Sequence, residues 1–207
     1  IMFKLHNPLI NAYAQRSPDN LFTVVMMVSI SIQQKWSLVG DMLADMVENK
    51  SHCMYLWGNK KSTYNYMVTH KHFLYGQMMA VMNSRNLTDH SKAMSLMNIF
   101  LKVDGLGLAK AGFVCQLVGG LVGCMDVHNI KTYGVDPKSL ILNKNLTSAR
   151  GLVSNKEKVK KYIKLCEDYG TENLWNSWCS MIADKYPKDF VDSNHVSEVH
   201  YTNLIGE

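Results

Sequence analysis

The residues best suited to chemistry lie between residues 102 and 128, where a glycine-rich turn precedes an apolar helix of small residues and an Asp-x-His strip. Gly105 and Gly107 flank Leu106, a spacing that suits a sharp turn with positive φ or a close approach to the backbone. We expect the helix to begin near Leu108, which leaves its first backbone N–H groups free beside the glycines. Because free N–H groups at a helix start bind phosphate, this segment predicts a surface that a nucleic-acid backbone can approach.

Helices are expected to position this segment, because apolar residues recur at three- and four-residue spacing and strand signals are scarce. The pattern predicts helices over residues 24–46 (one bent helix or two), 67–82, 90–101, 155–169 and from 171 to before 187. The interval 52–65 shows no clear period and is expected to be a loop or short turn. The predicted fold class is therefore all-α.

Some boundaries of these helices can be predicted from single residues. Thr88 or Asp89 is a suitable N-cap for the helix that precedes the glycine turn, and Gly170 is a suitable stop for the helix over 155–169. The expected buried side of the helix over 67–82 comprises Phe73, Met78, Met79 and Met82.

Length and composition indicate a globular intracellular protein. The chain has 207 residues, 47% hydrophobic and 19% charged, enough to bury the core of one large domain or two small lobes. Its five cysteines are odd in number and irregularly spaced, which argues against a disulfide framework and for a reducing compartment. The longest apolar runs are too short to span a bilayer, so no membrane partner is expected. We expect a monomer in the cytoplasm or nucleoid.

Positive charge is concentrated in one part of the chain. Residues 101–165 contain 11 Lys or Arg and 4 Asp or Glu, a balance of +7, whereas the remainder has a balance of −2. Such a basic region is the electrostatic signature of a phosphate-binding surface. The alternative is a solvated helix face, to which the lysines between 156 and 164 could belong. Beside the glycine turn the first interpretation is favoured, and double-stranded DNA is the expected partner.

The turn, the apolar helix and the Asp-x-His strip together resemble the helix-hairpin-helix DNA glycosylase superfamily, which includes endonuclease III and 8-oxoguanine glycosylase. The family hairpin reads roughly Leu-Pro-Gly-Val-Gly-x-Lys-Thr-Ala, and Val-Asp-Thr-His follows after a buried helix. Residues 103–107 correspond to the hairpin and residues 125–128 to the catalytic strip. Near the N-terminus, Ser31-Ile32-Gln33 matches the Ser-Ala-Gln that ends the family's opening helix, where the glutamine enters the duplex in place of the flipped base.

The resemblance implies a two-lobed helical fold with DNA across the cleft. Residues 1–30 and 130–207 would form one lobe, and residues 31–129 would form the other, with the hairpin region at 102–121. The paired late helices of the family would correspond to residues 156–186.

The resemblance also assigns roles to individual residues. Asp126 corresponds to the aspartate that stabilises the cationic sugar as the glycosidic bond breaks, a task that suits a carboxylate because it offsets developing charge and orients a water. Its alternative role is the N-cap of the next helix, and the two roles are compatible. His128 either contacts a DNA phosphate or supports the strip. The implied DNA-binding set is Gln33, Gly105, Leu106, Gly107, Leu108, Lys110 and His128.

Two departures limit what the resemblance implies. Bifunctional glycosylases carry a lysine nucleophile two residues after the second hairpin glycine, and this position is Ala109. Lys110 is turned about 100° away around the helix, so it is the nucleophile candidate only if the hairpin is one residue longer. The cysteines lack a Cys-x-x-Cys pair, so no iron–sulfur cluster is expected. No cofactor for the chemistry and no transition metal are expected, while a monovalent cation at the hairpin stays open.

Three functions are compatible with this sequence. The first is a monofunctional DNA glycosylase in which Asp126 assists an attacking water. The second keeps the fold and changes the reaction: bacteriophage thymine-hypermodification systems contain similar proteins that replace an activated group on 5-hydroxymethyluracil with an amine or amino acid. The third is a non-catalytic DNA-binding or structural phage protein. Trp57, Tyr64 and Tyr66 are candidates for a base-stacking pocket, although core packing is the better expectation for each.

Overall fold

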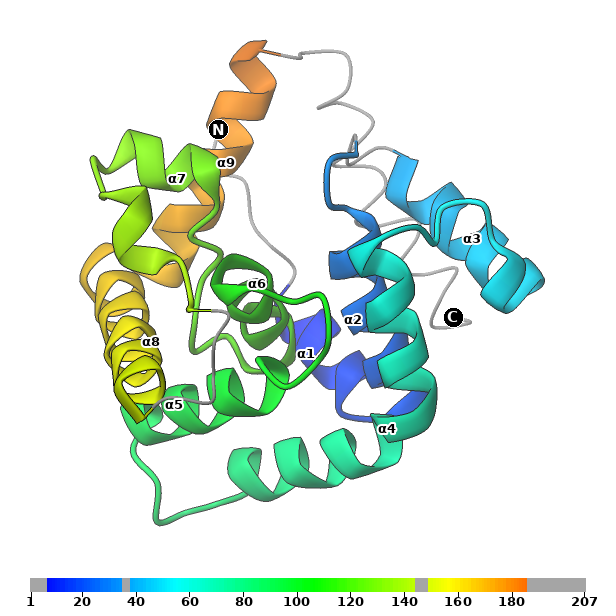
Figure 1. Cartoon of the computed structure of the whole chain (residues 1–207), viewed down its shortest axis with the longest axis horizontal. Helices are drawn as coiled ribbons and strands as arrows, with labels where there is room; N and C mark the ends of the chain where they lie inside the picture. Colours follow the sequence, from blue (N-terminus) through cyan, green and yellow to red (C-terminus); the bar gives the residue numbers. More distant parts are fainter. Residues whose placement is uncertain (1–6, 35–37, 144–148, 186–207) are drawn as a thin grey trace.

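The structure is a computed structural model that describes residues 7–34, 38–143 and 149–185, and the regular elements in these ranges are all helical (Figure 1). The α-helices are α1 (Asn7–Ala14), α2 (Pro18–Ile30), α3 (Val39–Asn49), α4 (Asn59–Met82), α5 (Asp89–Phe100), α6 (Leu108–Gly119), α7 (Val127–Thr132), α8 (Ala149–Tyr169) and α9 (Thr171–Lys185). Two short 3-10 helices, η2 (Lys50–His52) and η3 (Pro137–Leu140), lie in the connections. The all-α prediction is confirmed. None of the helices just named is both long enough and apolar enough to cross a membrane.

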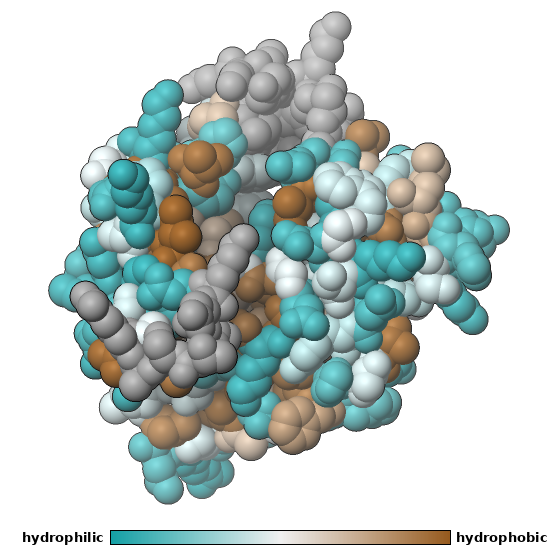
Figure 2. Space-filling view, in the orientation of Figure 1, coloured by the Kyte–Doolittle hydropathy of each residue, from teal (hydrophilic) through white to brown (hydrophobic). Residues whose placement is uncertain are grey.

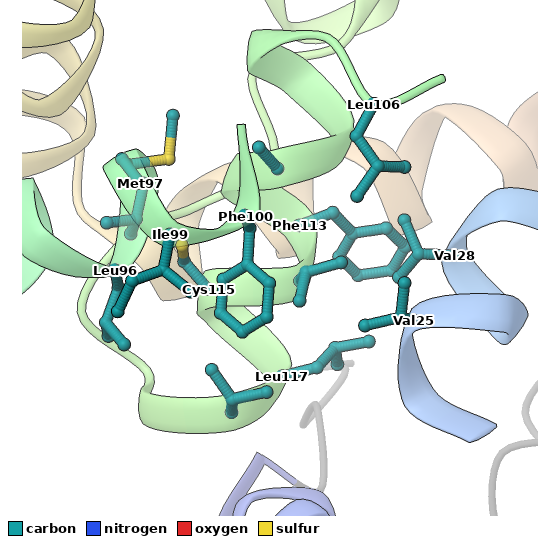
Figure 3. Packing of buried hydrophobic residues seen from close by; sticks show 14 of the residues in the cluster. Val25, Val28, Leu96, Met97, Ile99, Phe100, Leu106, Phe113, Cys115 and Leu117 are labelled. Atoms are coloured by element: carbon teal, nitrogen blue, oxygen red, sulfur yellow. The ribbon is translucent and has the colours of Figure 1, made fainter. Parts of the chain in front are cut away.

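Helix α6 lies in the middle of the molecule, in contact with α1, α2 and α5 (Figure 1). Its one charged residue is Lys110, and every residue from Ala111 to Val118 is buried. Phe113 points toward Val28 of α2 and toward Leu106 of the preceding turn (Figure 3). A helix can be enclosed in this way because it is apolar nearly all round. Its burial fixes the segments at both of its ends.

A second, smaller cluster of buried side chains joins α3 to the end of α2. It consists of Met26, Ile30, Val39, Met42, Leu43, Met46, Cys53 and Leu56. The main cluster draws on α1, α2, α4, α5, α6, α8 and α9. Helix α2 therefore contributes to both clusters, and the assignment of residues to two lobes stays a prediction.

Several predicted boundaries are confirmed. Thr88 caps α5, where its Oγ1 accepts a hydrogen bond from the Ser91 N–H at 3.2 Å. Helix α6 begins at Leu108 as expected. Helix α8 ends immediately before Gly170, whose φ of +81° places it in the left-handed region that favours glycine.

Two helix starts differ from the sequence-based expectation. Helix α4 begins at Asn59, inside the interval expected to be a loop. The buried residues of its first turns are Lys60 and Thr63. Polar side chains of this kind give no apolar period, so the pattern missed them. Helix α8 begins at Ala149 rather than near residue 155.

The buried side of α4 also differs in one position. Phe73 is 60% exposed, whereas Met67, Leu74 and Met78 are fully buried. Adjacent helical positions are about 100° apart, so a face that includes Leu74 turns Phe73 toward solvent. The prediction for Met78 is confirmed, and the one for Phe73 is wrong.

The turn between α5 and α6 packs against the start of α4. Thr63 Oγ1 donates a hydrogen bond to the Asp104 carbonyl oxygen at 2.7 Å. Gly105 has a φ of +86°, and a Cβ there would lie 2.7 Å from Thr63 Oγ1 and closer still to the Asn59 carbonyl oxygen. Gly107 has a φ of −92°, and a Cβ there would meet nothing within 4 Å. The fold therefore requires glycine at the first of the two positions alone.

We predict that Gly105→Ala destabilises the protein by about 2 kcal/mol or more, because it combines a left-handed φ with a steric overlap against α4. Gly107→Ala is the matched control and is expected to change stability by less than about 0.5 kcal/mol. Urea unfolding followed by circular dichroism measures both. Equal stability of the two variants would contradict the packing of this turn against α4.

Candidate functional site

Asp126 lies at the start of α7 and serves as its N-cap. Its Oδ1 accepts hydrogen bonds from the backbone N–H groups of His128 and Asn129, both at 3.0 Å. The residue is half-buried, and its second carboxylate oxygen accepts no hydrogen bond from the part of the chain that the structure describes. The capping role predicted for Asp126 is therefore confirmed, and one oxygen is left for another task.

The backbone just before Asp126 is held by a buried tyrosine. The Tyr162 hydroxyl donates to the Gly123 carbonyl oxygen at 2.8 Å and accepts from the Met125 N–H at 2.8 Å. Tyr162 is fully buried, and burial raises the pKa of its phenol well above the usual value, so the hydroxyl keeps its proton. Helix α8 thereby fixes the backbone of residues 123–125 through one side chain.

Two buried amides complete the hydrogen bonding of the same strip. Gln116 of α6 accepts from the Cys124 N–H through its Oε1 at 3.1 Å. Asn129 donates through its Nδ2 to the Cys124 carbonyl oxygen at 2.8 Å and to the Leu174 carbonyl oxygen at 2.9 Å. Buried amides with such partners rigidify irregular backbone, so Asp126 is held at a defined position.

Lys110 extends from the first turn of α6 to the end of α2. Its Nζ donates to Ser31 Oγ at 3.4 Å, and Ser31 Oγ in turn donates to the Val28 carbonyl oxygen at 2.7 Å. The same ammonium lies 5.9 Å from the centroid of the Phe113 ring. Lys110 thus lies beside the Ser31-Ile32-Gln33 strip, although its spacing put it one position away from the lysine of the resembled family.

Cys124 lies within electrostatic reach of both Lys110 and Asp126. Burial raises the pKa of its thiol to about 12; the positive charge of Lys110 acts to lower that pKa, and the carboxylate of Asp126 acts to raise it. The structure therefore brings Lys110 into contact with Ser31, 79 positions earlier in the sequence, and places Cys124, two positions before Asp126, within reach of the charge of Lys110. Figure 2 shows a hollow between the side occupied by α6 and α7 and the side occupied by α2 and α4.

Gln33 follows the end of α2 and is exposed, with a φ of +57°. A left-handed backbone is uncommon for residues other than glycine and often marks a functional position. Gln33 follows Ser31 by two residues, and Ser31 is the residue that Lys110 of the first turn of α6 contacts.

The predicted hairpin residues present backbone rather than side chains. Leu106 and Leu108 are buried in the core, whereas Gly107 is exposed. Gly107 caps α6 without a side chain, so no side-chain oxygen occupies the N–H groups of the first turn. His128 is half-buried in the first turn of α7, and its ring makes no hydrogen bond with the described residues.

The predicted aromatic residues divide into two groups. Tyr64 packs edge-on against Phe22 at 5.7 Å, and Tyr66 stacks on His70 at 4.2 Å, so both belong to local packing. Trp57 is half-exposed, and its ring lies 4.6 Å from the Nζ of Lys60.

Lys60 is a residue that the sequence did not single out. It is 2% exposed, and its ammonium has no hydrogen-bond partner among the described residues. Burial lowers its pKa, and the charge of Lys110 lowers it further. Because this segment has no apolar period, the sequence pattern does not indicate that the lysine is buried.

Three of the lysines of α8, Lys158, Lys160 and Lys164, have partners on the molecule itself. Lys160 pairs with Glu157 at 2.8 Å and Lys164 with Asp168 at 3.1 Å, each on the same helix and exposed. Lys158 donates to the Ile141 carbonyl oxygen. This pairing favours a solvated helix face for these lysines over the phosphate-binding alternative.

The structure offers no cluster of metal ligands within residues 7–34, 38–143 and 149–185, where no three His, Cys, Asp or Glu lie together as a metal ion requires. Cys53, Cys115, Cys124 and Cys166 are free thiols.

No protein-family model, characterised protein or solved structure matches this chain. The family resemblance therefore depends on the residues themselves.

We predict that Tyr162→Phe lowers the free energy of unfolding by about 1–3 kcal/mol, because it removes the acceptor of the Met125 N–H and leaves the Gly123 carbonyl with only the weak bond from the Cys166 thiol at 3.5 Å. Tyr169→Phe is the control on the same helix, since the Tyr169 hydroxyl has no hydrogen bond within the described chain. Chemical denaturation of both variants tests the prediction. A loss of similar size in the two would show that the tyrosine does not hold the strip.

Proposed function

We propose that this protein is a DNA-binding enzyme of the helix-hairpin-helix glycosylase superfamily, and that it acts on a nucleobase flipped out of a duplex. The reaction is hydrolysis of the N-glycosidic bond by a monofunctional mechanism. Asp126 stabilises the positive charge that develops on the sugar, and water attacks the anomeric carbon.

The observation that carries the proposal is the contact of Lys110, in the first turn of α6, with Ser31 at the end of α2, which joins the predicted hairpin segment to the predicted wedge segment. Ser31 and Lys110 are 79 positions apart in the sequence, and a hydrogen bond joins their side chains in the structure. The charges of Lys110 and Asp126 both act on Cys124. A glycosylase needs this set in one place, because the wedge, the phosphate contact and the carboxylate serve the same flipped nucleotide.

Backbone geometry supports the DNA-binding half of the proposal. The exposed Gly107 and the uncapped start of α6 leave N–H groups available to a phosphate. Lys110 supplies a charge in the same turn, and the exposed Gln33 with its left-handed backbone supplies an amide that can enter the duplex.

Asp126 can act catalytically while it caps α7. The two N–H groups occupy Oδ1, so the orientation of the carboxylate is fixed and Oδ2 is left to face a reacting group. Preorganisation of this kind stabilises charge without reorganisation during the reaction.

The register at Ala109 leads to a prediction about the mechanism. Incubation of the protein with DNA that contains abasic sites, followed by borohydride, is expected to trap no covalent adduct, because the position of the family's lysine nucleophile lacks an amine. Gel mobility or mass spectrometry of the treated protein measures the outcome. An adduct that disappears in Lys110→Ala would instead make Lys110 a Schiff-base nucleophile and the protein a lyase.

The role of Asp126 is tested by Asp126→Asn. Asparagine caps a helix about as well as aspartate, so the melting temperature should stay nearly constant, whereas base release should fall by about a hundredfold or more. Asp136→Asn is the matched control, because Asp136 caps η3 in the same manner, through the Lys138 N–H at 3.1 Å, and is exposed. It should leave both quantities unchanged.

The substrates for this test are duplexes that carry damaged or 5-substituted pyrimidines, with DNA affinity measured in parallel at two salt concentrations. If the parent protein binds duplex DNA and reacts with none of them, a non-catalytic binding module becomes the better description. If a reaction is found and Asp126→Asn keeps full activity, the catalytic assignment is wrong.

A further inference from the structure

Two lysines stand in the first turns of two helices of this structure. Lys60 belongs to the first turn of α4 and Lys110 to the first turn of α6. The start of α4 lies against the turn before α6, as the hydrogen bond from Thr63 to the Asp104 carbonyl shows. A helix start carries partial positive charge, and a lysine there adds to it rather than balancing it.

The usual compensation for such a start is absent. Neither α4 nor α6 has an acidic residue in its first turn, and neither start is capped by a side chain. Lys60 is 2% exposed, and its ammonium has no hydrogen-bond acceptor within the described chain. An ammonium buried without a hydrogen-bond acceptor is costly, and the face of the Trp57 ring offsets only part of that cost, so a site of this kind calls for an anion.

The present contacts of the two ammonium groups can be exchanged for contacts with an anion. Lys110 donates to Ser31 Oγ at 3.4 Å, a long and weak bond that a stronger acceptor can replace. Lys60 is covered by the ring of Trp57 at 4.6 Å, and this ring is itself half-exposed on the connection before α4. Trp57 can therefore move aside without opening the core.

We propose that Lys60 and Lys110 form an anion subsite for a phosphate group, covered by Trp57 when the site is empty. The binding phosphate accepts hydrogen bonds from both ammonium groups and takes the place of the Trp57 ring over Lys60. Two ammonium groups beside two uncapped helix starts match a multiply charged oxyanion better than a carboxylate. The phosphate comes either from a DNA backbone or from a separate phosphorylated ligand.

The test uses the full chain and inorganic phosphate, without DNA, so that it can fail independently of the proposed glycosylase activity. Calorimetric titration of the parent protein with phosphate at constant ionic strength is expected to show one saturable site. Lys60→Met should weaken this binding by about tenfold or more, the loss expected for a charged hydrogen bond. Lys61→Met is the matched control, since Lys61 is the exposed neighbour on the same helix, and it should stay within about twofold of the parent.

Two further readouts separate a binding role of Lys60 from a structural one. Tryptophan fluorescence should change on phosphate addition, and Trp57→Phe should remove this change while calorimetric binding persists. Nuclear magnetic resonance of the lysine ε-methylene groups should show that phosphate raises the pKa of Lys60. Absence of saturable binding, equal affinity of Lys60→Met and Lys61→Met, or an unchanged Lys60 signal would overturn the proposal.

A duplex oligonucleotide added to the phosphate complex identifies the source of the anion. Displacement of phosphate by the duplex would assign the subsite to a backbone phosphate. Simultaneous binding of both would assign it to a separate phosphorylated ligand. Either result requires that phosphate binds first, so both support the subsite.

Discussion

Burial of α6 is the constraint on which the rest of the structure depends. A helix apolar nearly all round can exist in water only if other elements enclose it, and α1, α2 and α5 do so. The chain on either side of the helix then has to leave the core within a few residues. The turn before it contains Gly105 and Gly107, and the strip after it contains Cys124 and Asp126. The candidate site thus occupies the two exits of one buried helix.

Irregular backbone next to a core has to satisfy its hydrogen bonds with side chains, and this explains the polar residues of the interior. Tyr162, Gln116 and Asn129 are buried, and each bonds backbone groups of residues 123–125. Their positions on α8, α6 and α7 tie three helices to one short strip. The orientation of Asp126 is a consequence of this network together with its own capping bonds.

Lys60 is buried without a bond of this kind. Its ammonium is enclosed under Trp57 without an acceptor among the described residues, and the charge of Lys110 lies near enough to lower its pKa. A protein tolerates such a group at a cost in stability, and groups of this kind concentrate at functional sites. The positive ends of α4 and α6 act in the same direction as the two lysines.

The sequence by itself determined the helical class, the starts of α5 and α6, the end of α8 and the capping role of Asp126, because each follows from local backbone chemistry. The side chains of Thr88 and Asp126 accept hydrogen bonds from N–H groups in the first turn of the helix that each precedes, and Gly170 ends α8 with a left-handed backbone. No distant residue is needed for either effect. The glycine turn was identified for the same reason, although the sequence did not distinguish Gly105, which α4 forbids from carrying a side chain, from Gly107, which has open space. Only the tertiary structure decided that Lys110 reaches Ser31, that Tyr162 holds the strip before Asp126 and that Lys60 is buried. The first contact joins residues 79 positions apart and the second joins residues 37 positions apart, whereas the third finding is the burial of a polar side chain. Hydrophobic periodicity carries no information about long-range contacts or about buried polar side chains.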